Sequence, residues 1–121
     1  MNSEAELLEF VASSFKSVWA LEVVLALRRN RDRTWRPDDI IKELRSSRLV
    51  VAEALNNLAA AGLVAEEDGG GFRYAAADAL EETMAEVDKL YAVKPTVVIR
   101  SIVSTPNAKL QILSNAFRIK E

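Results

Sequence analysis

The fold of this chain is decided by residues 36–74, which read RPDDIIKELRSSRLVVAEALNNLAAAGLVAEEDGGGFRY. Pro37 has a backbone angle that suits the first residue of a helix, and Asp38 and Asp39 place negative charge at the positive end of the helix dipole. Apolar residues follow at the spacing of one amphipathic face, and they are Ile40, Ile41 and Leu44. We therefore predict a short helix that begins at Pro37.

A break and a second helix follow directly. Ser46 and Ser47 interrupt the apolar pattern, and either hydroxyl can cap a new helix by accepting a hydrogen bond from a backbone N–H group of its first turn. The apolar face of this second helix consists of Val51, Leu55 and Leu58. Gly62 readily adopts the left-handed conformation that ends helices, so we predict that the second helix stops there.

A β-hairpin is predicted after the second helix. Residues 63–65 and 72–75 are short apolar runs on either side of a glycine-rich turn at residues 68–71. Such a pattern is typical of two antiparallel strands joined by a tight loop. The order helix, turn, helix and hairpin predicts a mainly α-helical protein with a small β-hairpin.

A recognisable residue pattern runs through this region: Glu43-Leu44, Ser47, Val51, Ala54-Leu55, Leu58 and Ala61-Gly62-Leu63-Val64. The pattern and the element order resemble the winged helix-turn-helix domain of MarR-like and related prokaryotic transcriptional regulators. The resemblance covers residues 17–76. It implies that the second helix is a DNA-recognition helix, that the hairpin is a wing, and that the protein works as a homodimer. It also implies that residues 34–36 form a short strand beside the wing, where Trp35 is a packing residue.

The rest of the chain divides around this domain. Residues 1–16 are predicted to be an N-terminal helical extension, because Ser3 and Glu6 form a capping-box pattern. Ser17 is placed to cap the next helix, residues 18–29, whose apolar residues and Trp19 are predicted to lie in the core. Residues 77–121 are predicted to be a C-terminal helical region that serves in dimerisation or partner binding. The expected fold is thus a winged helix-turn-helix with extra helices at both ends.

Composition excludes several classes of function. The chain has 121 residues, a formal net charge of −2, no cysteine and no histidine. The commonest general base, the commonest transition-metal ligand and every thiolate are therefore missing, so we expect no enzyme activity, no metal site and no cofactor. The N-terminus lacks a signal-peptide pattern, and the apolar run at 18–27 is too short for a membrane span. We expect a cytoplasmic protein with no membrane partner.

The expected partner is double-stranded DNA. Residues 28–48 carry eight basic and four acidic side chains. This basic block lies just ahead of the predicted recognition helix, where a phosphate backbone could be approached. Within this block, residues 28–33 are either a solvated connector or a phosphate-contacting loop. Projection of the second helix places Leu49, Glu53, Asn56 and Ala60 opposite its buried face, with Val50 and Asn57 beside them.

Eight residues are the candidates for contacting DNA. Those predicted to meet base edges are Arg48, Glu53, Asn56 and Asn57. Those predicted to contact phosphates are Arg33, Arg36, Ser47 and Arg73. Leu49 and Val50 have the chemistry to contact a thymine methyl group.

A protein partner is the alternative to DNA. The wing is acidic, since Glu66, Glu67 and Asp68 precede its glycines, and carboxylates there would repel a phosphate backbone. Leu49 and Val50 are apolar on the predicted reading face. In this alternative the domain is a protein–protein interaction adaptor that does not bind DNA.

The C-terminal region is predicted to contain further helices. One helix follows a cap at Asp78 and ends at Lys94-Pro95, and its apolar seam consists of Leu80, Met84, Val87 and Tyr91. This seam packs either within the chain or against a second copy as a dimerisation surface. Residues 96–103 have strand propensity, but Pro95 and the i,i+4 apolar pairs favour a helix. A last helix is predicted over residues 108–119.

Overall fold

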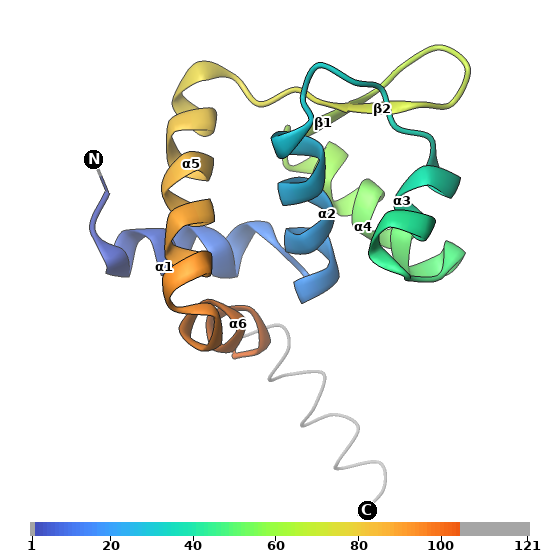
Figure 1. The fold of residues 1–121 in the computed structure, drawn as a ribbon. Helices are drawn as coiled ribbons and strands as arrows, with labels where there is room; N and C mark the ends of the chain where they lie inside the picture. The colour runs from blue at the N-terminus through green and yellow to red at the C-terminus, as the bar shows by residue number, and fades with distance from the viewer. Residues whose placement is uncertain (1, 105–121) are drawn as a thin grey trace, which may run out of the picture.

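The structure, a computed structural model, describes residues 2–104. They form a mainly helical protein with one two-stranded antiparallel hairpin (Figure 1). The elements are α1 (Glu4–Ser14), α2 (Val18–Arg29), α3 (Pro37–Leu44), α4 (Arg48–Ala60), β1 (Val64–Glu66), β2 (Phe72–Tyr74), α5 (Asp78–Val93) and α6 (Pro95–Val103). The predicted helix over residues 108–119 lies outside the described residues.

The two N-terminal helices begin where the sequence predicts. Ser3 and Glu6 form the capping box of α1, in which each side chain accepts a hydrogen bond from the other residue's backbone N–H. Ser17 accepts a hydrogen bond from the backbone N–H of Ala20 and so caps α2. The two helices meet at an angle of 106°. Their caps explain why a chain with a long apolar stretch turns sharply instead of continuing as one helix.

A tight turn separates α3 from α4, as the serine pair predicts. Arg45 adopts a left-handed backbone conformation, with φ 52° and ψ 46°, and its N–H donates back to the end of α3. Ser47 then accepts a hydrogen bond of 3.3 Å from the backbone N–H of Val50 and caps α4. Both ends of the break are therefore satisfied by local hydrogen bonds, which fixes the direction in which α4 leaves α3.

The end of α4 leads straight into the hairpin. Gly62 has a φ of 77°, its N–H donates to the carbonyl of Ala59, and the N–H of Leu63 donates to the carbonyl of Leu58. This is a Schellman ending, which only a residue that tolerates positive φ completes without strain. In the hairpin Val64 pairs with Tyr74, and Glu66 pairs with Phe72.

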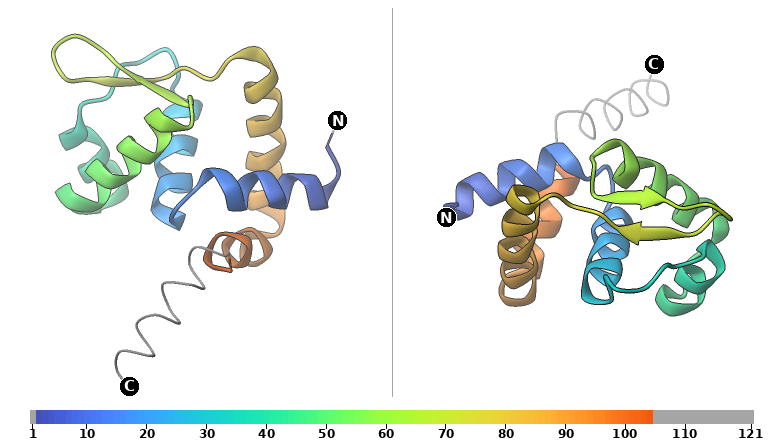
Figure 2. Two further views of the ribbon diagram at one scale, coloured as in Figure 1. Left: turned by 180° about the vertical axis from the view of Figure 1, so that it is seen from behind. Right: turned by 90° about the horizontal axis from the view of Figure 1, so that it is seen from above.

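A third extended segment lies beside the hairpin. Trp35 and Phe72 exchange two backbone hydrogen bonds, each 2.7 Å long, so that residues before α3 pair with β2. The predicted pairing of residues 34–36 with the hairpin is confirmed at Trp35 alone, as a single antiparallel bridge and not as a strand. Trp35 is buried, which confirms it as a packing residue. The hairpin is therefore held to the start of α3 rather than projecting alone (Figure 2).

The C-terminal helices pack on α1. Residues 95–103 form a helix, which confirms the choice of helix over strand, and α6 packs against α1 and α5. Figure 2 shows these three helices on the side away from α3 and α4. Asp78, however, is the first residue of α5 and not its cap, because Ala77 occupies the cap position without a side-chain hydrogen bond.

One hydrophobic core extends across the N-terminal extension, the central region and the C-terminal helices. Phe15 from the end of α1, Leu58 from α4 and Met84 from α5 are all buried in it. The prediction that Trp19 belongs to the core is wrong, because its side chain is 38% exposed. Its neighbours Leu21 and Val24 are fully buried, as predicted.

The predicted dimer seam on α5 faces the inside of the chain. Met84 and Val87 have no exposed surface, and Leu80 and Tyr91 are half-buried against the same core. The Tyr91 hydroxyl also donates to a carboxylate oxygen of Glu22 on α2. The dimerisation role predicted for the seam is therefore wrong for Met84 and Val87, because packing within the chain buries both side chains. The helical spacing of apolar residues is the same whether a seam packs within the chain or against a second copy.

Asn57 holds the junction between α1 and α2. Its amide oxygen accepts from the backbone N–H of Lys16 at 2.8 Å, and its amide nitrogen donates to the carbonyl oxygen of Ser14 at 2.9 Å. The residue is 8% exposed. The prediction that Asn57 contacts a base edge is wrong, because both polar ends of its side chain bond backbone groups that the α1–α2 turn leaves without helical partners.

Replacement of Asn57 tests this assignment. Asn57→Ala leaves two partly buried backbone groups without partners, so the free energy of unfolding should fall by about 1–3 kcal/mol. Asn56→Ala is the matched control, because Asn56 is the exposed neighbour on the same helix, and it should change stability by less than about 0.5 kcal/mol. Urea denaturation of both variants measures the difference. Equal stabilities would contradict the structural role of Asn57.

Candidate nucleic-acid interface

Helix α4 presents one side to solvent along its whole length. Leu49, Glu53, Asn56 and Ala60 are exposed, as the helical projection predicts. Leu49 is the most exposed large apolar residue of the helix, with 69% of its surface accessible. The opposite side is buried through Val51, Ala54, Leu55 and Leu58. The turn before α4 and the hairpin after it therefore leave the outer side of this helix uncovered.

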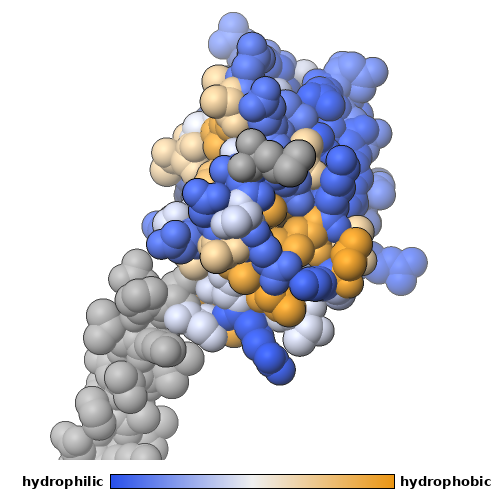
Figure 3. All heavy atoms as spheres, turned by 90° about the vertical axis from the view of Figure 1, so that its left-hand side faces the viewer, coloured by the Kyte–Doolittle hydropathy of each residue, from blue (hydrophilic) through white to orange (hydrophobic). Residues whose placement is uncertain are grey.

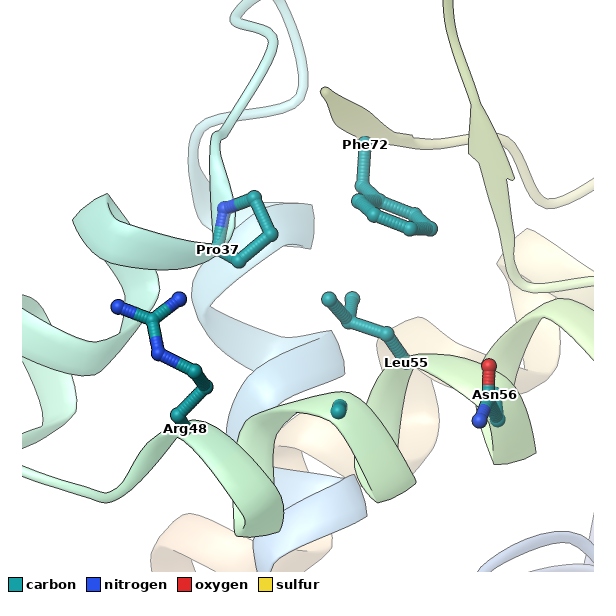
Figure 4. Close-up of a pocket in the computed structure, with 6 residues that line it drawn as sticks. Pro37, Arg48, Leu55, Asn56 and Phe72 are labelled. Atoms are coloured by element: carbon teal, nitrogen blue, oxygen red, sulfur yellow. The ribbon is translucent and has the colours of Figure 1, made fainter. Parts of the chain in front are cut away.

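A shallow groove separates α4 from the hairpin. It has a volume of about 250 Å³ and is lined by Pro37, Arg48, Ala52, Leu55, Asn56 and Phe72. Figure 4 shows Phe72 and Pro37 on one side, with Leu55 rising toward them from α4. Arg48 and Asn56 lie at the two ends, so the floor of the groove is apolar and its ends are polar.

Three of the residues that line this groove are not among those predicted from the sequence. Ala52 lies one turn from both Arg48 and Asn56, so the helical spacing was sufficient to place it on the same side. Pro37 and Phe72 are brought to the groove by the bridge between Trp35 and β2. That contact is non-local, and no pattern within either segment indicates it.

Arg33 and Arg36 lie where the hairpin meets the start of α3. The guanidinium carbon of Arg33 is 3.8 Å from the centroid of the Trp35 ring, in a cation–π arrangement. Arg36 donates a hydrogen bond of 2.9 Å to the backbone carbonyl of Gly69 in the hairpin loop. Both arginines are exposed. Arg36 ties the hairpin loop to the start of α3, while Arg33 pairs with Asp39 at 3.5 Å, and both leave guanidinium surface accessible to an anion.

Arg48 and Arg73 each hold one exposed ion pair. Arg48 pairs with Asp38 at 3.1 Å, with 77% of its side chain exposed, and Arg73 pairs with Glu67 at 3.2 Å. Glu67 also accepts from the Thr34 hydroxyl, and these hydrogen bonds lower the pKa of its carboxyl. Exposed ion pairs of this kind contribute about 0–1 kcal/mol, so a phosphate can replace the carboxylate at small cost.

Ser47 and Glu53 complete the predicted set. The Ser47 hydroxyl oxygen is used as the cap of α4, so its contact to a phosphate is restricted to its hydroxyl proton and its backbone. Glu53 is exposed on the outer side of α4. Seven of the eight predicted residues are thus exposed, on α4 and its cap, on the hairpin or on the segment that leads into α3. Asn57, which lies inside, is the exception.

The arginines at the end of α2 belong to a different part of the molecule. Arg28 donates to Glu81 through Nε at 3.0 Å and Nη2 at 2.8 Å, and to Asp88 through Nη1 at 3.0 Å. Arg29 and Arg31 pair with the same two carboxylates. The basic block that the sequence places ahead of α4 is therefore divided, because the carboxylates of α5 pair with its first part.

This network also involves the hairpin. The Tyr74 hydroxyl donates to Glu81 at 2.7 Å, and burial raises the pKa of Tyr74. The hydrogen bonds from Arg28 lower the pKa of the Glu81 carboxyl. Because that pKa is depressed in the folded protein, the stabilisation by this carboxylate is present at neutral pH and is lost as the pH falls through the folded value. The network connects α2, β2 and α5.

The side of the molecule that carries α1, α5 and α6 differs in character. Figure 3 shows a mixed surface on which apolar side chains gather beside charged ones. Val93, at the end of α5, is 75% exposed, and Val103, at the end of α6, is 50% exposed. Within residues 2–104, no cluster of three or more His, Cys, Asp or Glu side chains is arranged to hold a metal ion.

Comparison of the chain with protein-family models, curated proteins and solved structures finds no match. No individual helix of the described residues is both long enough and apolar enough to cross a membrane, although α1 and α2 would reach that length and apolarity if joined.

Removal of the Arg28 side chain tests the network. Arg28 is 14% exposed and joins two carboxylates, so Arg28→Ala should lower the free energy of unfolding by about 2–4 kcal/mol through the unpaired, partly buried charges that it leaves. Arg29→Ala removes the same charge from a side chain that is 57% exposed, and should cost less than about 1 kcal/mol. Urea denaturation at pH 7 compares them. A similar loss in both variants would contradict the special role of Arg28.

Proposed function

We propose that residues 17–76 are a winged helix-turn-helix domain and that the protein is a cytoplasmic transcriptional regulator that binds double-stranded DNA. The recognition element is α4 and the wing is the β1–β2 hairpin. The observation that carries this proposal is the exposure of α4 along one side, together with four exposed arginines on α4 itself, on the hairpin and on the segment before α3, namely Arg33, Arg36, Arg48 and Arg73.

The exposure of these four arginines supports a role in binding phosphate. Each is tied only by contacts at the surface, whereas Arg28 is fixed by several hydrogen bonds in a partly buried network. A guanidinium in an exposed pair can exchange its carboxylate for a phosphate oxygen and gain a bidentate contact. In this arrangement Arg33, Arg36, Ser47 and Arg73 contact the backbone, while Arg48, Glu53 and Asn56 reach base edges.

A protein partner is the second candidate, because of the groove and the local charge. Residues 33–73 carry six basic and seven acidic side chains, so the face as a whole does not attract a polyanion at long range. The groove floor is apolar, and Leu49 lies exposed on the same helix. An adaptor would insert an apolar side chain between Leu55 and Phe72.

Salt dependence distinguishes the two functions. With a fluorescein-labelled random 20-base-pair duplex, anisotropy should show binding that weakens with salt by a slope of about −0.9 for each phosphate contacted. Arg36→Gln should weaken binding several-fold and reduce the slope by about 1, whereas Arg48→Gln should weaken binding several-fold through the loss of a base-edge contact. Arg31→Gln is the matched control: it removes the same charge from an exposed side chain paired with α5, and it should leave binding unchanged.

Two outcomes would contradict DNA binding. One is no binding at 50 mM salt; the other is binding that the Arg36 and Arg48 variants weaken no more than the Arg31 variant does. Either result would favour the protein-docking function. Replacement of the groove residue Phe72 would be the first test of that function.

A further inference from the structure

We infer that α4 recognises thymine methyl groups, in a stretch of about three base pairs rich in A·T, through apolar contacts more than through charge. This inference rests on the proposed DNA binding and specifies which base pairs the face prefers. It accounts for the feature that least resembles a DNA-reading helix, namely its exposed leucine and alanine.

The length of the exposed row sets the size of the site. Leu49, Ala52, Glu53 and Asn56 are exposed at successive turns of α4. The eight residues from Leu49 to Asn56 are separated by seven steps of 1.5 Å, so they span about 10 Å along the helix. Because consecutive bases are spaced about 3.4 Å apart, this row covers about three base pairs in the major groove.

The chemistry of the row selects among the four base pairs. The C5 methyl of thymine is the apolar group of the major-groove edge, and burial of one methyl group contributes about fourfold in affinity. Leu49, which is 69% exposed, and Ala52 have no polar side-chain atom and can gain only from such a contact. Guanine and cytosine offer no methyl group to either residue.

The polar members of the row point to the same preference. Asn56 lies exposed at one end of the groove, and an asparagine amide can pair with both N7 and the N6 amino group of adenine. Glu53 accepts hydrogen bonds and cannot donate them when ionised, so it is repelled by the two acceptors of guanine. Adenine or cytosine, each with an amino group, is tolerated beneath it.

The position of Arg48 suits a contact at the edge of this stretch. It opens α4 beside Leu49 and lies at the other end of the groove from Asn56 (Figure 4). A contact from Arg48 to a base edge there would set the depth at which Leu49 enters the major groove. The apolar contacts would then determine the base-pair preference, while the arginines supply most of the affinity.

Base analogues test this inference without changing charge. The probes are 20-base-pair duplexes of alternating d(AT), alternating d(AU) and alternating d(GC), the last prepared with cytosine or with 5-methylcytosine. Uracil lacks only the methyl group of thymine, and 5-methylcytosine adds a methyl at the equivalent position. We expect d(AT) to bind at least fourfold more tightly than d(AU), and 5-methylation to improve binding to d(GC).

The variant Leu49→Ala should reduce the d(AT)/d(AU) ratio toward 1 while salt-dependent binding remains. Val93→Ala is the control, because Val93 is an exposed apolar residue on α5 and its loss should leave the ratio unchanged. Leu49 is largely exposed, so its replacement should not alter the thermal unfolding midpoint, which circular dichroism checks.

The possible failures are distinguishable. Salt-dependent binding to all duplexes with a d(AT)/d(AU) ratio near 1 would overturn this inference and leave the proposed function standing. A ratio that persists in Leu49→Ala would also overturn it, because the discrimination would then come from duplex shape. No binding to any duplex would overturn both and would favour a protein partner for the groove.

Discussion

The left-handed turn at Arg45 and the Ser47 cap are the constraint on which the rest of the structure depends. Together they end α3 and start α4 in a new direction, so that the apolar side of α4 meets α2 and its other side faces solvent. If the helix continued through residues 45–47, Leu55 and Leu58 would lose their place in the core. The exposed row on α4 is a consequence of this turn.

A second constraint is the division of the arginines between two tasks. The carboxylates of α5 bind the arginines at the end of α2, while those near α3, α4 and the hairpin remain exposed. Since Tyr74 of β2 joins the same network, α5 also restrains the base of the hairpin. The C-terminal helices thus help to position the face that we propose binds DNA, although they lie on the other side of the molecule.

Most of the fold could be predicted from local sequence signals. The wrong predictions concern residues whose surroundings depend on contacts with segments distant in the sequence. Ser3, Ser17, Pro37 and Gly62 act within one turn of their own position, so the helix boundaries followed from sequence alone. Asn57 lies toward the edge of the exposed side of α4, and the turn between α1 and α2 that covers it cannot be located from the sequence of α4. The α5 seam was misassigned for the same reason. The groove likewise depends on the bridge between Trp35 and Phe72.

The most direct measurement is a titration of the ¹⁵N-labelled protein with a duplex rich in A·T, followed by amide chemical shifts. The account predicts changes concentrated at residues 33–36, 47–56 and 71–73, with the amides of α5 and α6 little affected. Shifts centred on Val93 and α6, or no shifts at 50 mM salt, would contradict the assignment of the α4–hairpin face as the DNA-binding surface.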